Sequence, residues 1–82
     1  MPTVLRFGGF RVVVYLNDHR PAHVHVIGLG HEAVFKLNCP AGPVTVRENY
    51  GFSSRDLIRI AGVLLENIDA LCQAWERIHG IA

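Results

Sequence analysis

Three of the five histidines lie close together in the segment from Asn17 to Val26, NDHRPAHVHV. Side chains alternate between the two faces of a strand, so His23 and His25 should project from the same face, about 7 Å apart. Two imidazoles at that spacing can share a metal ion, a phosphate or a proton. His19 precedes them on a predicted turn and can reach the same place. This segment is the strongest candidate for a functional site.

Three roles are open for this histidine cluster. In the first, the imidazoles are structural and donate hydrogen bonds to backbone carbonyls or pack beneath aromatic rings. In the second, His23 and His25 bind a divalent metal, because His-x-His on a strand presents two nitrogens at a workable spacing. His19, His31 or Asp18 would then complete the ligand set.

The third role is acid–base chemistry on a phosphate, as expected of a small metal-independent ribonuclease. All three histidines of the cluster are then candidate catalytic residues, one as the general base and another as the general acid. Asp18 would orient an imidazole, and Arg20 or Arg11 would bind the substrate anion. The sequence does not separate this role from metal binding.

The register of the next strand pair decides which way the histidines face. If His25 pairs with Ala33, both histidines share a face with Phe35, and that face would be the core. If the pairing is shifted by one residue, they share a face with Glu32, Val34 and Lys36 and point toward solvent or a cleft. The first register favours the structural role, and the second favours a site.

The cluster must be positioned by an antiparallel meander. Runs rich in apolar and β-branched residues, separated by glycine, proline and asparagine, predict strands. Their ranges are 3–7, 10–16, 22–27 and 31–37, with a short fifth strand at 44–47. Gly8-Gly9 suits a two-residue hairpin turn between the first two. The first half of the chain is therefore predicted to be a four- to five-stranded sheet.

The second half has the apolar period of a helix. Ser53 is a predicted N-cap, with Asp56 in the position of a capping box, and Gly80 is a predicted stop. The apolar series passes Asn67 without a change of phase, which predicts one helix of about 26 residues, roughly 39 Å long. Its overhang beyond the sheet would mediate dimerisation. The alternative is a helix pair that is broken near Asn67 and folds back on the sheet.

These elements predict an α+β fold in a single domain. The domain covers residues 1–82, with the sheet in 1–47 and the helical part in 52–80. Trp75 lies on the main apolar stripe of the helix, so we expect it to pack in the core or in a dimer interface.

Composition limits the partners. Half of the 82 residues are apolar and 18% are charged. A chain of this size buries only about 60% of its unfolded surface, so we expect a homodimer or a partner protein to cover part of the rest. The net charge of +1 excludes nucleic-acid binding by charge alone. Lys36 is the single lysine beside seven arginines, and arginine favours bidentate contacts to phosphate, so locally bound RNA remains possible.

The cysteines and the chain ends bear on location. Cys39 and Cys72 have no CxxC or paired spacing, and Cys72 falls within the helical apolar pattern, which predicts a buried thiol. The first residues lack the organisation of a signal peptide, and no apolar run approaches the roughly 18 residues of a membrane span. We therefore expect a reduced, soluble, cytoplasmic protein without a membrane partner.

The segment from Asp18 to Val26, the helix start Gly51-Phe52-Ser53 and the late Trp75 resemble the small bacterial family DUF4160. The resemblance covers nearly the whole chain, from Pro2 onward, and the DHRPAHVHV segment is its specific part. Genes of such proteins typically lie beside a second small domain, in pairs that look like type II toxin–antitoxin modules. The resemblance implies that this chain is the toxin-like member, held in check by an antitoxin-like partner.

The resemblance also carries over four site residues: Asp18, His19, His23 and His25. This chain departs from the usual pattern at Ala22, where a second proline is common, and at Lys36, where an aromatic residue is common. The sheet face near the cluster is therefore more polar here.

Two functional hypotheses follow. In one, the chain is a toxin-like component that acts through its histidine cluster on RNA, with or without a divalent metal. In the other, it is a non-enzymatic module that binds a metal, a ligand or a protein, and its histidines are structural. An enzyme needs them open to a cleft with basic neighbours, while a binding module can bury them. An antitoxin-like role is disfavoured because no strongly charged or disordered tail is present.

Overall fold

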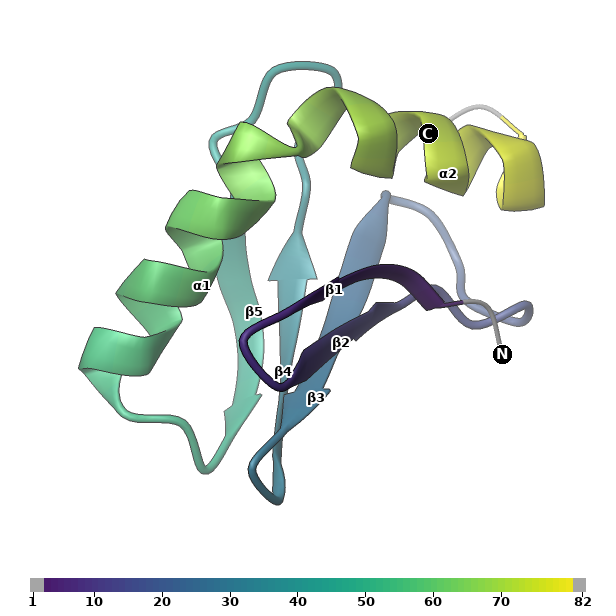
Figure 1. Cartoon of the computed structure of the whole chain (residues 1–82). Coiled ribbons are helices and arrows are strands. Elements are labelled where there is room, and N and C mark those ends of the chain that lie inside the picture. The colour runs from purple at the N-terminus through teal and green to yellow at the C-terminus, as the bar shows by residue number, and fades with distance from the viewer. Residues whose placement is uncertain (1–2, 81–82) are drawn as a thin grey trace.

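The computed structural model describes residues 3–80 and contains a five-stranded antiparallel sheet in chain order (Figure 1). The strands are β1 (Thr3–Phe7), β2 (Phe10–Val13), β3 (His23–Gly28), β4 (His31–Lys36) and β5 (Thr45–Tyr50). The predicted α+β meander is confirmed. β2 ends earlier than predicted and β5 runs past the predicted limit of residue 47. The predicted domain of residues 1–82 extends beyond the described residues, and Pro2 lies outside them.

Two helices follow the sheet, α1 (Ser54–Glu66) and α2 (Ile68–His79), so the prediction of one unbroken helix is wrong and the broken pair is right. The break lies at Asn67, whose side-chain Nδ2 donates to the carbonyl of Val63 at 2.9 Å. Asparagine side chains compete for backbone hydrogen bonds in this way and so interrupt helices. The overhang on which we based dimerisation is therefore not formed. Neither helix of the described chain is long and apolar enough to cross a bilayer.

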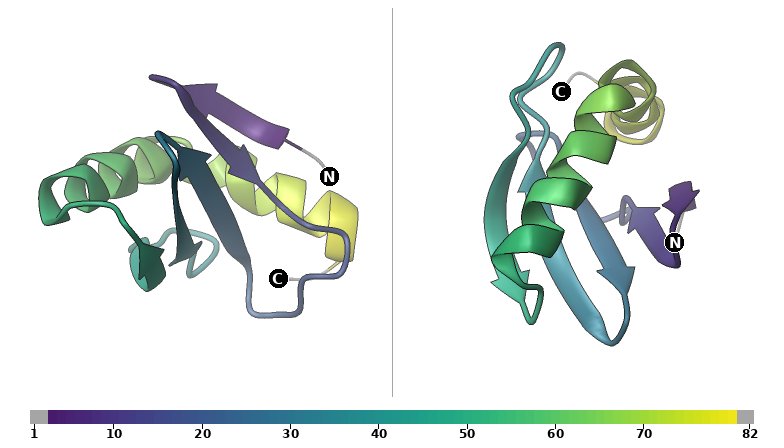
Figure 2. Two further views of the ribbon diagram at one scale, coloured as in Figure 1. Left: turned by 90° about the horizontal axis from the view of Figure 1, so that it is seen from below. Right: turned by 60° about the vertical axis from the view of Figure 1, so that its left-hand side comes forward.

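The ends of the helical part are where the sequence predicts them. Ser53 Oγ accepts the backbone N–H of Asp56 at 3.1 Å, which caps α1. Gly80, with φ 81°, ends α2. Both helices lie on the same side of the sheet (Figure 2).

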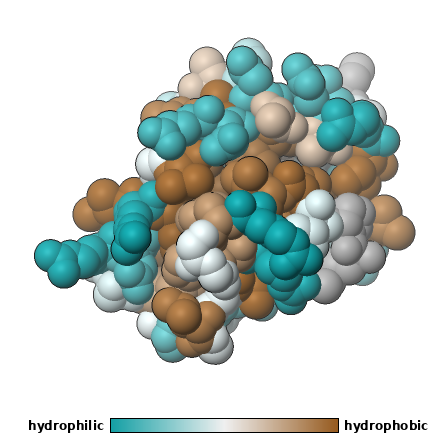
Figure 3. Space-filling model, in the orientation of Figure 1, coloured by the Kyte–Doolittle hydropathy of each residue, from teal (hydrophilic) through white to brown (hydrophobic). Residues whose placement is uncertain are grey.

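The core lies between the sheet and the helices. The sheet contributes alternate side chains of β2, β3 and β4, and the helices contribute their apolar stripes. The largest fully buried members include Trp75, Phe35, Leu37, Ile60, Leu64 and Leu71. Hydrophilic side chains cover the outer surface of the helices at the top of Figure 3, and apolar atoms lie below them, toward the sheet. The predicted burial of Trp75 is confirmed.

Cys39 and Cys72 form a disulfide, so the prediction of two free thiols is wrong for this structure. Cys39 lies between β4 and β5, and Cys72 lies in α2. The two residues are 33 positions apart in sequence, but their Cα atoms are 5.9 Å apart. That distance is within the usual range for a disulfide. Only the packing of the β4–β5 connection against α2 brings them together.

Candidate functional site

The register of β3 and β4 places the histidines on the sheet face opposite the main row of core side chains. His25 pairs with Val34, and His23 pairs with Lys36. Both histidines therefore lie on the sheet face opposite Val24 and Phe35, which pack in the core. This is the shifted register, the one that favours a site over a purely structural role.

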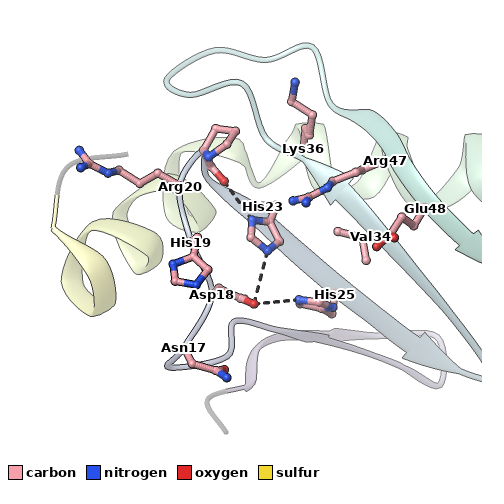
Figure 4. A pocket seen from close by; sticks show the side chains of 11 residues that line it. Asn17, Asp18, His19, Arg20, His23, His25, Val34, Lys36, Arg47 and Glu48 are labelled. Carbon is pink, nitrogen blue, oxygen red and sulfur yellow. Dashed lines mark hydrogen bonds and ion pairs between the residues drawn. The ribbon is translucent and has the colours of Figure 1, made fainter.

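Asp18 is held above these histidines by the turn that follows β2. Its Oδ2 accepts the backbone N–H of Tyr15 at 3.0 Å, and its own N–H donates to the carbonyl of Tyr15 at 3.1 Å. Aspartate commonly closes turns by such local hydrogen bonds. The other oxygen, Oδ1, lies 3.4 Å from Nε2 of His23 and 3.3 Å from Nε2 of His25 (Figure 4). We call Asp18, His23 and His25 the Asp–His–His cluster.

The far side of each imidazole also has a partner. Nδ1 of His23 donates to the carbonyl of Pro21 at 2.9 Å. Nδ1 of His25 lies 3.2 Å from Oε2 of Glu32. Every ring nitrogen of the cluster therefore faces an oxygen atom, and both rings are fixed in orientation.

Aromatic packing fixes the rings further. His23 is 5% exposed and packs against Trp75, with ring centroids 5.2 Å apart. His25 packs edge-on against Tyr15, with centroids 4.5 Å apart. Burial, and then the carboxylate of Glu32, raise the pKa of Tyr15 above its usual value, so this phenol keeps its proton at neutral pH.

A cleft of about 530 Å³ opens over the cluster. Its wall includes three cationic side chains, those of Arg20, Lys36 and Arg47 (Figure 4). Within residues 3–80, none of the three takes part in an ion pair. Glu48 also borders the cleft and accepts a hydrogen bond from the hydroxyl of Tyr50. Unpaired cations in a concave site favour the binding of an anion such as phosphate.

The structure separates the other predicted site residues. His19 and Arg20 line the cleft, but His19 is exposed and is not one of the three converging side chains. His31 pairs with Gly28 at the far end of the β3–β4 hairpin and packs against Phe52, so it is not brought to the cluster. Arg11 borders a second, smaller cavity beside the β1–β2 turn and does not line the cleft.

A family model described as "Domain of unknown function (DUF4160)" matches residues 9–76. The chain belongs to this family. No curated protein and no solved structure matches the chain. The DUF4160 match contains the whole Asp–His–His cluster and every residue that lines the cleft. Because the family description gives no activity, the function of this DUF4160 chain must be inferred from its site.

One residue of the cleft, Arg47, was not predicted from the DUF4160 sequence. Glu32 is paired with Ile27, one step along the cleft face from His25, as the shifted register predicts. Arg47 lies at a β-bulge: Val46 and Glu48 pair with consecutive residues of β4, which leaves Arg47 as the extra residue. Bulges redirect side chains next to active sites, and alternation alone cannot predict them.

Proposed function

We propose that this DUF4160 chain is the toxin-like member of a bacterial type II toxin–antitoxin pair and that it cleaves RNA in the cleft over the Asp–His–His cluster. The supporting observation is the convergence of Asp18, His23 and His25 beside cations that have no ion-pair partner in residues 3–80. RNA is the substrate we favour because the cleft combines groups that move protons with groups that bind phosphate.

The two sets of side chains match the two requirements of phosphodiester cleavage. The attacking oxygen must lose a proton, and the charge that develops on the phosphate oxygens must be stabilised. The Asp–His–His cluster supplies the first function. Arg20, Lys36 and Arg47 supply the second, with arginine suited to bidentate contact. His19, at the rim, adds a further donor.

The proposal includes a protein partner and a location. Exposed apolar side chains lie on β5 (Val46 and Tyr50) and on α1 (Ile58 and Leu65), and all of β5 is an exposed edge strand. Such surfaces are typical of protein contacts. We propose that an antitoxin-like protein binds the toxin-like chain tightly, that the chain forms a homodimer, and that it acts in the cytoplasm.

A second candidate is a non-enzymatic binding module, and the burial of His23 against Trp75 favours it. A buried imidazole can hold a ligand or stabilise the fold without contacting a reacting substrate. The toxin proposal predicts that the chain cleaves RNA and arrests growth, and the binding module predicts neither.

Growth of a bacterial host after induction of this chain alone tests the proposal. We expect the wild type to arrest growth, and we expect Asp18→Asn and the double variant His23→Ala/His25→Ala to relieve the arrest. His31→Gln is the matched control, because this histidine lies outside the cleft, and it should still arrest growth. Each variant is purified to confirm that it folds.

Two outcomes would contradict the toxin proposal. One is normal growth with a folded, well-expressed wild type, which would leave the binding module as the better account. The other is arrest by a folded Asp18→Asn variant at the wild-type level, which would place the toxicity elsewhere.

A further inference from the structure

We infer that the Asp–His–His cluster binds a divalent transition-metal ion through Oδ1 of Asp18, Nε2 of His23 and Nε2 of His25. One ligand atom from each of the three residues lies within 4.8 Å of the other two. The inference deepens the proposed function, on which it rests for the role of the ion in RNA cleavage. The binding of the ion can be measured without that function.

The hydrogen-bond geometry of His23 supports a cation at the cluster. Its Nδ1 lies 2.9 Å from the carbonyl of Pro21, which can only accept, so Nδ1 carries the proton of the neutral ring. Nε2 then carries a lone pair and can only accept. It faces Oδ1 of Asp18, which is also an acceptor. Two acceptors in contact need a positive species between them.

His25 presents the same arrangement. Its Nδ1 faces the carboxylate of Glu32, and its Nε2 faces the same oxygen of Asp18. A neutral imidazole has one N–H, so one of its two nitrogens must face a carboxylate oxygen with a lone pair and no proton. A single cation at the cluster satisfies both Nε2 atoms at once.

The distances suit a shared ion better than direct hydrogen bonds. Hydrogen bonds from a cationic N–H to a carboxylate are about 2.7–2.9 Å long. The Asp18 Oδ1 separations are 3.4 Å to His23 and 3.3 Å to His25. Two ligand atoms bound to tetrahedral zinc at about 2.0–2.2 Å lie about 3.3–3.5 Å apart. These two separations match two edges of such a site.

The outer contacts are those that metal-binding histidines make. A ligating imidazole almost always donates its other N–H to a carbonyl or a carboxylate, which fixes the tautomer. Pro21 supplies the carbonyl for His23, and Glu32 supplies the carboxylate for His25. The carboxylates of Asp18 and Glu32 together offset the two charges of a divalent ion.

The donor atoms select the kind of ion. Two imidazole nitrogens and one carboxylate oxygen suit zinc and its first-row neighbours, while Mg²⁺ and Ca²⁺ prefer oxygen ligands alone. All three residues of the cluster line the cleft, which leaves room for water or a phosphate oxygen as a further ligand. Water bound to such an ion would lose a proton to solvent near neutral pH, and its oxygen would attack the phosphorus. The bond from phosphorus to one ribose oxygen would then break, and that oxygen would take up a proton from water.

Titration of the full, chelator-stripped chain with Zn²⁺ in a calorimeter tests the inference. We expect one ion per chain, and no comparable binding of Mg²⁺. Asp18→Asn keeps an oxygen for the N–H of Tyr15, so the turn should form, but the affinity should fall at least about tenfold. Glu32→Ala should weaken binding by about 10–100-fold through the outer contact to His25. Glu48→Ala, the matched control at the same cleft, should bind as the wild type does.

Each alternative result overturns the inference. Wild-type chain that binds no Zn²⁺, or that binds Mg²⁺ equally well, contradicts the assigned ligand set. Unchanged affinity in both Asp18→Asn and Glu32→Ala places the ion elsewhere. RNA cleavage in the absence of all metal overturns the role in cleavage that this inference gives the ion and leaves the proposed function intact. Zinc binding without growth arrest or RNA cleavage overturns the proposed function and leaves this inference intact.

Discussion

His25 lies directly opposite Val34 across the β3–β4 ladder. This pairing puts the imidazole on the cleft face, two positions along the strand from His23, where both rings meet Asp18. A slip of one residue would move every side chain of β3 to the other face and bury both imidazoles among the core residues. The register of one hairpin therefore determines whether the Asp–His–His cluster forms.

Arg47 should bind phosphate from its position at the bulge of β5. Arg47→Gln is expected to weaken single-stranded RNA binding and to lower the dependence of log K on log salt by about one unit, as expected for one lost phosphate contact. Filter binding across a salt series measures both quantities. Arg55→Gln, an exposed arginine of α1 outside the cleft, is the control and should change neither. Equal effects of the two variants would show that the cleft has no special role in RNA binding.

Trp75 should be a main determinant of stability because it is fully buried. Trp75→Ala is expected to lower the free energy of unfolding by about 3–5 kcal/mol, through lost burial and the cavity left behind. Trp75→Phe should be milder, since Nε1 of Trp75 has no hydrogen-bond partner among the described residues and none is lost. Urea unfolding measures both. A Trp75→Ala variant as stable as the wild type would contradict the described core.

Gly51 should tolerate no side chain. Its φ is 110°, a conformation that favours glycine, and an added Cβ would overlap the ring of His31. Gly51→Ala is expected to lower the free energy of unfolding by more than about 1 kcal/mol. In a His31→Ala background the same change should be less damaging, because the overlap is removed and only the backbone strain remains. Additive effects of the two substitutions in urea unfolding would contradict this contact.

The disulfide should stabilise the fold. It closes a loop with a sequence separation of 33, for which the entropy of the unfolded chain predicts a contribution between about 3 and about 4.7 kcal/mol. Unfolding by urea with and without a reductant measures it, and mass spectrometry of alkylated protein verifies the bond. Two alkylated thiols in protein purified without reductant would contradict the pairing. Because the cytosol keeps most thiols reduced, the proposed location requires that the reduced form remain folded, which the unfolding curve with reductant tests.

Local patterns predicted most of the fold, because strands and caps depend on neighbouring residues. The Gly8-Gly9 turn, the Ser53 cap and the stop at Gly80 all follow from local chemistry. The break at Asn67 was harder to predict, since the apolar phase continues through it and the hydrogen bond from the Asn67 side chain to the carbonyl of Val63 is not recorded in that pattern.

The candidate site was predicted in part, because some of its residues are close together in sequence and others are not. Asp18, His23 and His25 lie close in sequence, and the structure brings them together. His31 and Arg11 were predicted from residue type alone, and the sheet carries them elsewhere. Arg47 and the bond between Cys39 and Cys72 depend on contacts between distant segments, which no local pattern records.

Cleavage of single-stranded RNA by purified protein tests the central claim most directly. With Zn²⁺ present, the wild type and His31→Gln are expected to cleave the RNA at similar rates. Asp18→Asn and His25→Gln are expected to lose at least about a hundredfold in rate, because they remove groups that activate the attacking oxygen. Cleavage by both folded cluster variants at the wild-type rate, or no cleavage by the wild type, would contradict the account.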